Sequence, residues 1–106
     1  MITDEQAEKA NDWIRDNATQ AAQAKSNRLH LEEFRKAKKA ELFLHAPGGT
    51  VADKEAFAYS HPDYLALLDG YRVAVEEDER MRWMMEAAAL RVEIWRTQSA
   101  NNRRGI

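Results

Sequence analysis

The chain contains no cysteine and few residues that break helices. Without cysteine, disulfides and thiolate metal sites are excluded. Only two prolines and four glycines occur in 106 residues, so long stretches are free to form helices. No apolar run approaches the roughly 18 residues that cross a membrane, and the first residues lack the basic and then apolar order of a signal peptide. We expect a soluble, cytoplasmic protein that does not associate with membranes.

The sequence predicts an all-α protein with one domain. Two long helices, from Thr3 to Leu44 and over residues 63–98, flank a turn and a short helix within residues 46–60. Residues 99–106 read as a flexible basic tail. Folding back at the break gives an antiparallel long-helix hairpin, a coiled-coil-like helical bundle.

Helix ends are marked at the break. Pro47 stops the first helix, and Gly48 and Gly49 can adopt the positive φ that turns the chain. Pro62 suits the first position of the second long helix, where we favour His61 over Ser60 as the cap.

Two capping boxes are also predicted. Thr3 and Gln6 have the right spacing at the start of the first helix, and Thr50 and Asp53 have it at the start of the short one.

Apolar side chains recur at alternating steps of three and four on both long helices. In the first helix this row holds Ala10, Ile14, Ala21, Ala24, Leu31 and Leu42, and in the second Leu67, Tyr71, Ala74, Met81, Met85, Ala88, Val92 and Trp95. Asn17, Arg28 and Asp78 interrupt the rows. A hairpin with one such row per helix leaves much apolar surface wet, so we expect a homo-oligomeric bundle, either a dimer or a tetramer.

The break also predicts a register for the hairpin. With equal rise on both helices, the numbers of facing residues should sum to about 109, which places Trp13 near Trp95. Arg28 then lies within a turn of Asp78, and an ion pair would satisfy both charges. Alternatively, each side chain bends outward from a narrow seam into water. The net charge alternates in sign over residues 1–24, 25–39, 40–90 and 91–106, which favours the same fold-back.

A cluster of methionines and tryptophan predicts a contact with another chain. Because residues 81–85 cover every side of a helix, some of them should face a partner instead of the hairpin seam. A core widened by Leu31 and Phe34 is the alternative. The predicted oligomer or partner interface is Trp13, Met81, Trp83, Met84, Met85 and Trp95.

Basic residues give a second candidate surface. A positive face could contact nucleic-acid phosphates, although cations late in a helix also suit its dipole and can pair within the chain. The candidates are Lys25, Arg35, Lys36, Lys38, Lys39, Arg103 and Arg104.

No spacing of residues indicates catalysis. His45, His61 and Asp63 lie close to the break, but no pair of histidines has the spacing of metal ligands on a helix. The run of carboxylates at 76–79 points around a helix and cannot converge on one cation. We therefore expect no enzymatic activity, no cofactor and no metal.

Four segments resemble those of small helical proteins of tailed bacteriophages and prophages. They are LEEFRK at 31–36, APGGT at 46–50, HPDYL at 61–65 and VEIWR at 92–96. The genes of such proteins lie among those for recombination and replication, near single-strand binding or strand-annealing proteins. The resemblance implies an accessory factor in phage DNA recombination or replication that acts through protein contacts in the host cytoplasm. A direct single-stranded DNA-binding protein and an inhibitor of a host protein are the alternatives.

Overall fold

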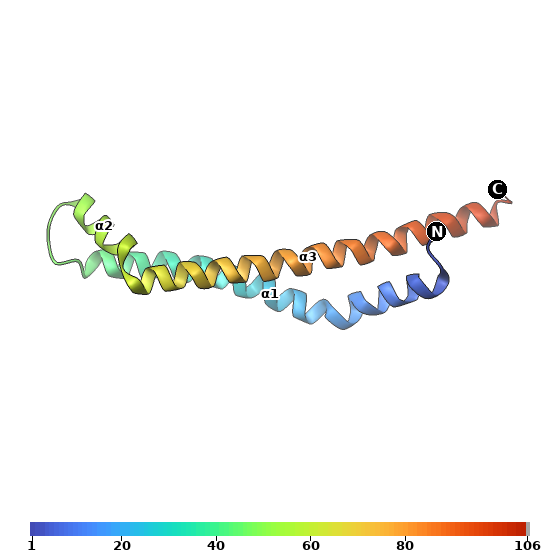
Figure 1. Cartoon of the computed structure of the whole chain (residues 1–106), viewed down its shortest axis with the longest axis horizontal. Helices are drawn as coiled ribbons and strands as arrows, with labels where there is room; N and C mark the ends of the chain where they lie inside the picture. The colour runs from blue at the N-terminus through green and yellow to red at the C-terminus, as the bar shows by residue number, and fades with distance from the viewer. Residues whose placement is uncertain (106) are drawn as a thin grey trace. The chain divides into compact units, whose positions relative to one another are not determined.

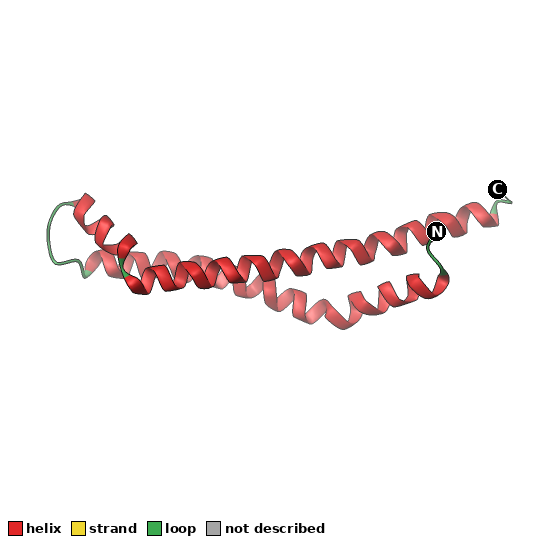
Figure 2. Ribbon diagram, viewed as in Figure 1, coloured by secondary structure: helices red, strands yellow, loops and turns green. Residues whose placement is uncertain are grey.

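A computed structural model describes residues 1–105 of the chain. These residues form three α-helices: α1 from Asp4 to Leu44, α2 from Val51 to Ser60, and α3 from Pro62 to Arg103 (Figure 1). No strand occurs among the residues described (Figure 2). The predicted all-α class is confirmed.

Both predicted capping boxes form. The backbone N–H of Thr3 donates to Gln6 Oε1 at 3.0 Å, and the N–H of Gln6 donates to Thr3 Oγ1 at 3.1 Å. The same exchange joins Thr50 and Asp53 at 3.1 and 3.2 Å. These bonds satisfy N–H groups that the first turn of α1 and of α2 leaves without partners.

Two glycines turn the chain between α1 and α2, as the sequence predicts. Gly48 and Gly49 have φ values of 90° and 95°, which side chains other than glycine rarely adopt. A Cβ on Gly49 would also lie 2.8 Å from Asp53 Oδ2, within the capping box. Gly49 is therefore required both by its backbone angle and by the close approach of the capping carboxylate.

The start of α3 agrees with the prediction, but its end does not. His61 Nδ1 accepts a hydrogen bond of 3.0 Å from the backbone N–H of Asp63, so His61 caps the helix. The helix continues past Gln98 to Arg103, so residues 99–103 are not part of a flexible tail. No proline or glycine interrupts the chain there, and the first residue that favours termination is Gly105, at φ 72°.

The described residues divide into two compact units. Unit 1 comprises Met1–Gln23 together with the residues from Glu79 onward, and unit 2 comprises Ala24–Asp78. Each unit pairs a part of α1 with an antiparallel part of α3, and unit 2 also contains α2. Since both long helices run through both units, the prediction of a single domain stays a prediction.

A seam with a seven-residue repeat joins the helices of each unit. Its positions alternate by three and four and are buried or half-buried, as in a coiled coil. In unit 1 they are Ala7, Ala10, Ile14, Asn17 and Ala21 of α1 with Met81, Met85, Ala88, Val92 and Trp95 of α3. In unit 2 they are Ala24, Arg28, Leu31, Arg35, Lys38 and Leu42 of α1 with Tyr64, Leu67, Tyr71, Ala74 and Asp78 of α3.

The predicted ion pair lies in the seam of unit 2. Arg28 Nε is 3.1 Å from Asp78 Oδ2, and the two side chains are 28% and 13% exposed. The pair thus satisfies two charges in a row that is otherwise mostly apolar, and neither side chain turns fully into the solvent.

In unit 2 the observed register lies within one turn of the prediction. The numbers of facing residues, 28 and 78 or 35 and 71, sum to 106 instead of about 109. Beyond the seam, α2 closes the end of this unit, where Leu42 and Tyr64 form a small buried cluster with Ala58.

In unit 1 the predicted register is wrong. Trp95 Nε1 donates to Asp4 Oδ1 at 2.7 Å, so Asp4 and not Trp13 lies against Trp95. The backbone N–H of Ile2 donates to Gln98 Oε1, which gives sums of 99 and 100 in this unit. The prediction extrapolates one register from the break along about ten turns, and any difference between the paths of the two helices adds up over that length.

Removing one charge of the seam pair should destabilise the fold more than removing both. Asp78→Ala leaves the partly buried guanidinium of Arg28 without this carboxylate, and we expect a loss of about 1 to 3 kcal/mol. In Arg28→Met with Asp78→Leu, apolar packing replaces the pair, so the loss should be smaller. Urea unfolding followed by circular dichroism measures both. Equal losses in the single and the double variant would contradict the role of the pair.

Candidate interaction surfaces

The predicted interface residues of unit 1 divide into seam residues and surface residues. Met81 is 1% exposed, so it packs within the chain and offers no surface to a partner, which corrects its assignment. Met85 and Trp95 are half-buried in the same seam. Trp83 and Met84 are exposed, by 61% and 45%. The cluster at 81–85 therefore divides between the seam and the surface, because its members point to different sides of α3.

A second apolar row follows α3 in unit 1, outside the seam. We call it the outer row: Trp83, Ala87, Leu90 and Ile94, spaced by four, three and four. At 100° per residue, its centre lies about 160° around the helix from the seam of Met81, Met85 and Ala88. Leu90 is 60% exposed and Ile94 40%. The outer row faces away from the part of α1 that pairs with α3 in this unit.

Beside the outer row, α1 and α3 of unit 1 form a shallow groove of about 380 Å³. Its lining is Gln6, Lys9, Ala10, Trp13, Met84, Ala87, Ala88 and Arg91. Trp13 and Met84, both predicted for the interface, thus meet in one groove, and Ala87 belongs to the groove as well as to the outer row.

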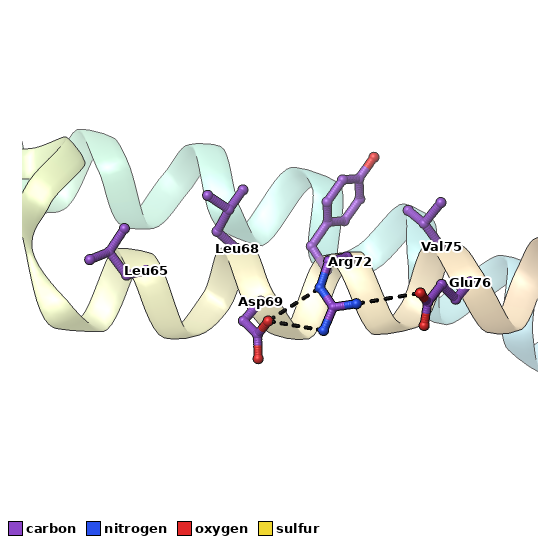
Figure 3. Close-up of a pocket in the computed structure, with 7 residues that line it drawn as sticks. Leu65, Leu68, Asp69, Arg72, Val75 and Glu76 are labelled. Atoms are coloured by element: carbon purple, nitrogen blue, oxygen red, sulfur yellow. Dashed lines mark hydrogen bonds and ion pairs between the residues drawn. The ribbon is translucent and has the colours of Figure 1, made fainter.

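Unit 2 carries a larger groove of about 610 Å³ along α3, which we call the α3 groove (Figure 3). Its apolar lining includes Leu65, Leu68 and Val75, of which Leu65 is 50% exposed. The apolar row predicted for this helix includes none of these three residues. The sequence does indicate their orientation. Each directly follows a seam residue and is therefore turned about 100° out of the seam.

A ladder of charges follows the edge of the α3 groove. Arg72 donates through Nε and Nη2 to Asp69 Oδ1, each at 3.3 Å, and through Nη1 to Glu76 Oε1 at 3.3 Å. Figure 3 shows the three apolar side chains following α3 beside this ladder. All three ladder residues are exposed, so the pairs add little stability, but they satisfy the charges next to the apolar strip.

Two of the predicted nucleic-acid contacts are seam residues of unit 2. The guanidinium of Arg35 lies over the ring of Tyr71, 5.0 Å from its centroid. Lys38 Nζ lies 3.5 Å from Glu41 Oε2 and 3.9 Å from Asp63 Oδ2. Both cations are half-buried. Lys38 is paired with carboxylates, whereas Arg35 contacts the ring of Tyr71 and its buried Nε has no hydrogen-bond partner among the described residues.

Two further candidates also contact neighbours on the surface of unit 2. Lys36 pairs with Glu33 at 3.4 Å. Lys39 donates to the hydroxyl of Tyr59 and lies 4.1 Å from the centroid of its ring. This hydrogen bond raises the pKa of Lys39 above its ordinary value. Lys25 of unit 2 and Arg103 and Arg104 of unit 1 are exposed.

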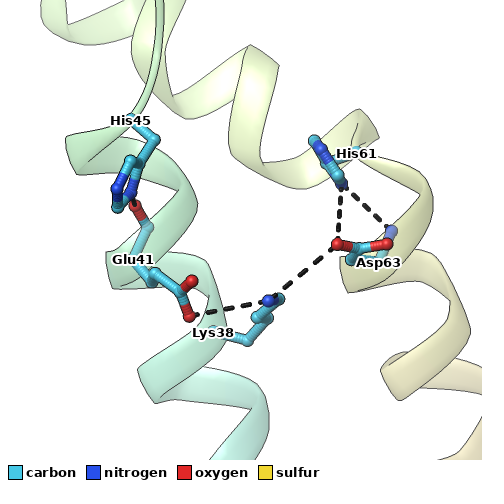
Figure 4. A network of polar contacts seen from close by, with 5 residues as sticks. All are labelled: Lys38, Glu41, His45, His61 and Asp63. Atoms are coloured by element: carbon cyan, nitrogen blue, oxygen red, sulfur yellow. Dashed lines mark hydrogen bonds and ion pairs between the residues drawn. The ribbon is translucent and has the colours of Figure 1, made fainter.

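The histidines near the break serve the helix ends (Figure 4). His45 Nδ1 lies 2.8 Å from the carbonyl oxygen of Glu41, in the last turn of α1. His61 Nδ1 caps α3 and lies 3.9 Å from Asp63 Oδ2, and Lys38 stands between Asp63 and Glu41. Within residues 1–105, no group of three or more histidine, aspartate and glutamate side chains is placed to hold a metal ion.

Truncation should separate the seam methionine from the surface methionine. Met81→Ala leaves a cavity in unit 1 and should cost about 2 to 5 kcal/mol. Met84→Ala removes a largely exposed side chain and should change the free energy of unfolding by less than about 1 kcal/mol. Urea midpoints measured at one protein concentration give the comparison, and equal shifts would contradict the assignment of the two faces.

Comparison with known proteins adds no assignment. No protein-family model, no curated protein and no solved structure matches the chain. Over the residues that the structure describes, none of the helices has the length and apolar character needed to cross a bilayer.

Proposed function

We propose that this protein has no enzymatic activity of its own and acts by binding another protein through helix-to-helix contacts. The α3 groove carries the proposal. Leu65, Leu68 and Val75 line it, although a seam one row wide already holds unit 2 together. Apolar side chains that are ordered along a helix and left out of the seam are typical of a binding surface.

The chemistry of the α3 groove suits an apolar side of a partner helix. Its volume of about 610 Å³ is enough for several side chains. Arg72 is already paired with Asp69 and Glu76, so a partner that covers the strip need not supply a countercharge. Satisfied charges at the edge and apolar area in the middle are the usual composition of a protein interface.

The resemblance to helical proteins of tailed bacteriophages supports a cellular process in which this binding would act. We place the protein among factors for phage DNA recombination or replication, where it would join or position other proteins. Direct binding of single-stranded DNA is less well supported, because Lys36, Lys38 and Lys39 have partners within unit 2. The guanidinium of Arg35 is half-buried over the ring of Tyr71.

A capture experiment tests the protein-binding surface. The wild-type chain and the variant Leu65→Ser with Leu68→Ser are immobilised and exposed to nuclease-treated lysate of the cells that naturally produce the protein. Val73→Ser is the matched control, because Val73 lies on the same helix, is 52% exposed and is not part of the α3 groove. We expect a partner protein at fixed stoichiometry on the wild type and the control, and its loss from the double variant.

Two results would contradict the proposal. One is the absence of any protein that distinguishes the double variant from the control. The other is capture from untreated lysate that is absent from the nuclease-treated lysate, since this would assign the interaction to nucleic acid. In that case, replacing Lys25, Arg103 and Arg104 with Ala should reduce the salt-sensitive part of the binding.

A further inference from the structure

The outer row of unit 1 extends into a longer seven-residue pattern on α3. Residues 80, 83, 87, 90, 94, 97 and 101 continue the alternation of three and four, and α3 is helical through Arg103. The apolar centre of the pattern is Trp83, Ala87, Leu90 and Ile94. One helix therefore carries two coiled-coil rows, an inner one that α1 covers within unit 1 and an outer one that is exposed.

The residues that flank the outer row differ between its two sides. One side is lined by Glu79, Glu86 and Glu93, which directly precede positions 80, 87 and 94 of the pattern. The other side is lined by Met84, Arg91 and Gln98, which directly follow positions 83, 90 and 97. One side thus carries three carboxylates followed by Ala100, and the other carries a single cation. Arg91 is exposed, and no ion pair involves it within residues 1–105.

These flanks select the orientation of a second copy. In an antiparallel pair, like sides of the two helices meet, so the three glutamates of each copy would face one another. In a parallel pair, opposite sides meet, and Glu86 faces Arg91 of the second copy, five residues further along. Two-fold symmetry forms this contact twice. Charge complementarity therefore favours the parallel arrangement and opposes the antiparallel one.

The identities in the row agree with a parallel pair. The row has two kinds of position, one before each step of three and one before each step of four. Ile94, which is β-branched, occupies the first kind, and Leu90 occupies the second. This arrangement favours two-stranded parallel coiled coils. Asn101 occupies the same kind of position as Ala87 and Ile94, where a polar side chain fixes the register of two parallel strands.

From these observations we propose that the protein forms a homodimer in which a second copy packs along the outer row, parallel and in register. The outer row lies on unit 1, whereas the α3 groove of the proposed function lies on unit 2. The dimer contact is thus separate from the partner contact, and either one can fail without the other.

Sedimentation equilibrium over a range of protein concentrations tests the dimer. The wild type should change from monomer to dimer as its concentration rises, and Leu90→Lys should stay monomeric. Leu29→Lys is the matched control, because it places the same charge at an exposed leucine of α1 that belongs to neither the outer row nor the α3 groove, and it should dimerise like the wild type. Circular dichroism verifies that each variant keeps the helix content of the wild type.

Exchanging charges tests the orientation. Glu86→Arg places a cation opposite the second copy's Arg91, and Arg91→Glu places a carboxylate opposite its Glu86. Each single variant should raise the dissociation constant of the dimer about tenfold, and the double variant should restore it. Glu86 also pairs with Arg82 at 3.4 Å within the chain, and Glu86→Arg removes this pair as well. The double variant lacks the same pair, so a restored dissociation constant shows that its loss does not cause the effect of the single variant.

A wild-type chain that stays monomeric at all concentrations overturns the dimer. A dimer that Leu90→Lys does not weaken overturns the outer row as its interface. A dimer that depends on Leu90 but is unaffected by both single charge variants overturns the parallel orientation. Capture of a partner that depends on Leu65 and Leu68 is a separate readout, so none of these results decides the proposed function.

Discussion

A seam only one row of residues wide is the constraint that determines most of this structure. Steps of three and four keep one row of each long helix against its neighbour, and positions beside that row, such as Trp13 and Val75, are only half-buried. Other apolar side chains of α3 remain on the surface by geometry, even in a chain with many of them. The exposed Leu65, Trp83 and Leu90 therefore follow from the same repeat that buries Met81.

The two units fill their seams with different chemistry. In unit 1, the seam combines small residues such as Ala10 and Ala88 with the long side chain of Met81. In unit 2, the seam of α1 contains three cations, and Arg28, Arg35 and Lys38 each meet an acidic or aromatic side chain of the antiparallel helix. Polar residues in such a row restrict register more than they stabilise, which explains how a basic segment can serve the fold.

Local signals in the sequence were enough to predict the helices and both capping boxes, since each depends on a few neighbouring residues or on periodicity. The pair of Arg28 with Asp78 was one of two alternatives, and it depends on the hairpin register, which in unit 2 lies within one turn of the prediction. The contact of Trp95 with Asp4 could not be predicted, because it depends on register far from the break. The surface position of Leu65 was missed, although its place directly after a seam residue turns it out of the row. The seam positions of Arg35 and Lys38 were missed because their charge suggested a surface, although their spacing already continued the repeat.

Thiol labelling would measure how narrow the seam is. The chain has no cysteine, so Met81→Cys and Leu90→Cys each introduce a single reactive group, one in the seam and one in the outer row. At a protein concentration low enough to keep the chain monomeric, the thiol at 90 should react nearly as fast as in urea. The thiol at 81 should react at least about tenfold more slowly, because it must wait for local opening. Equal rates at the two positions would contradict the division of α3 into an inner and an outer row.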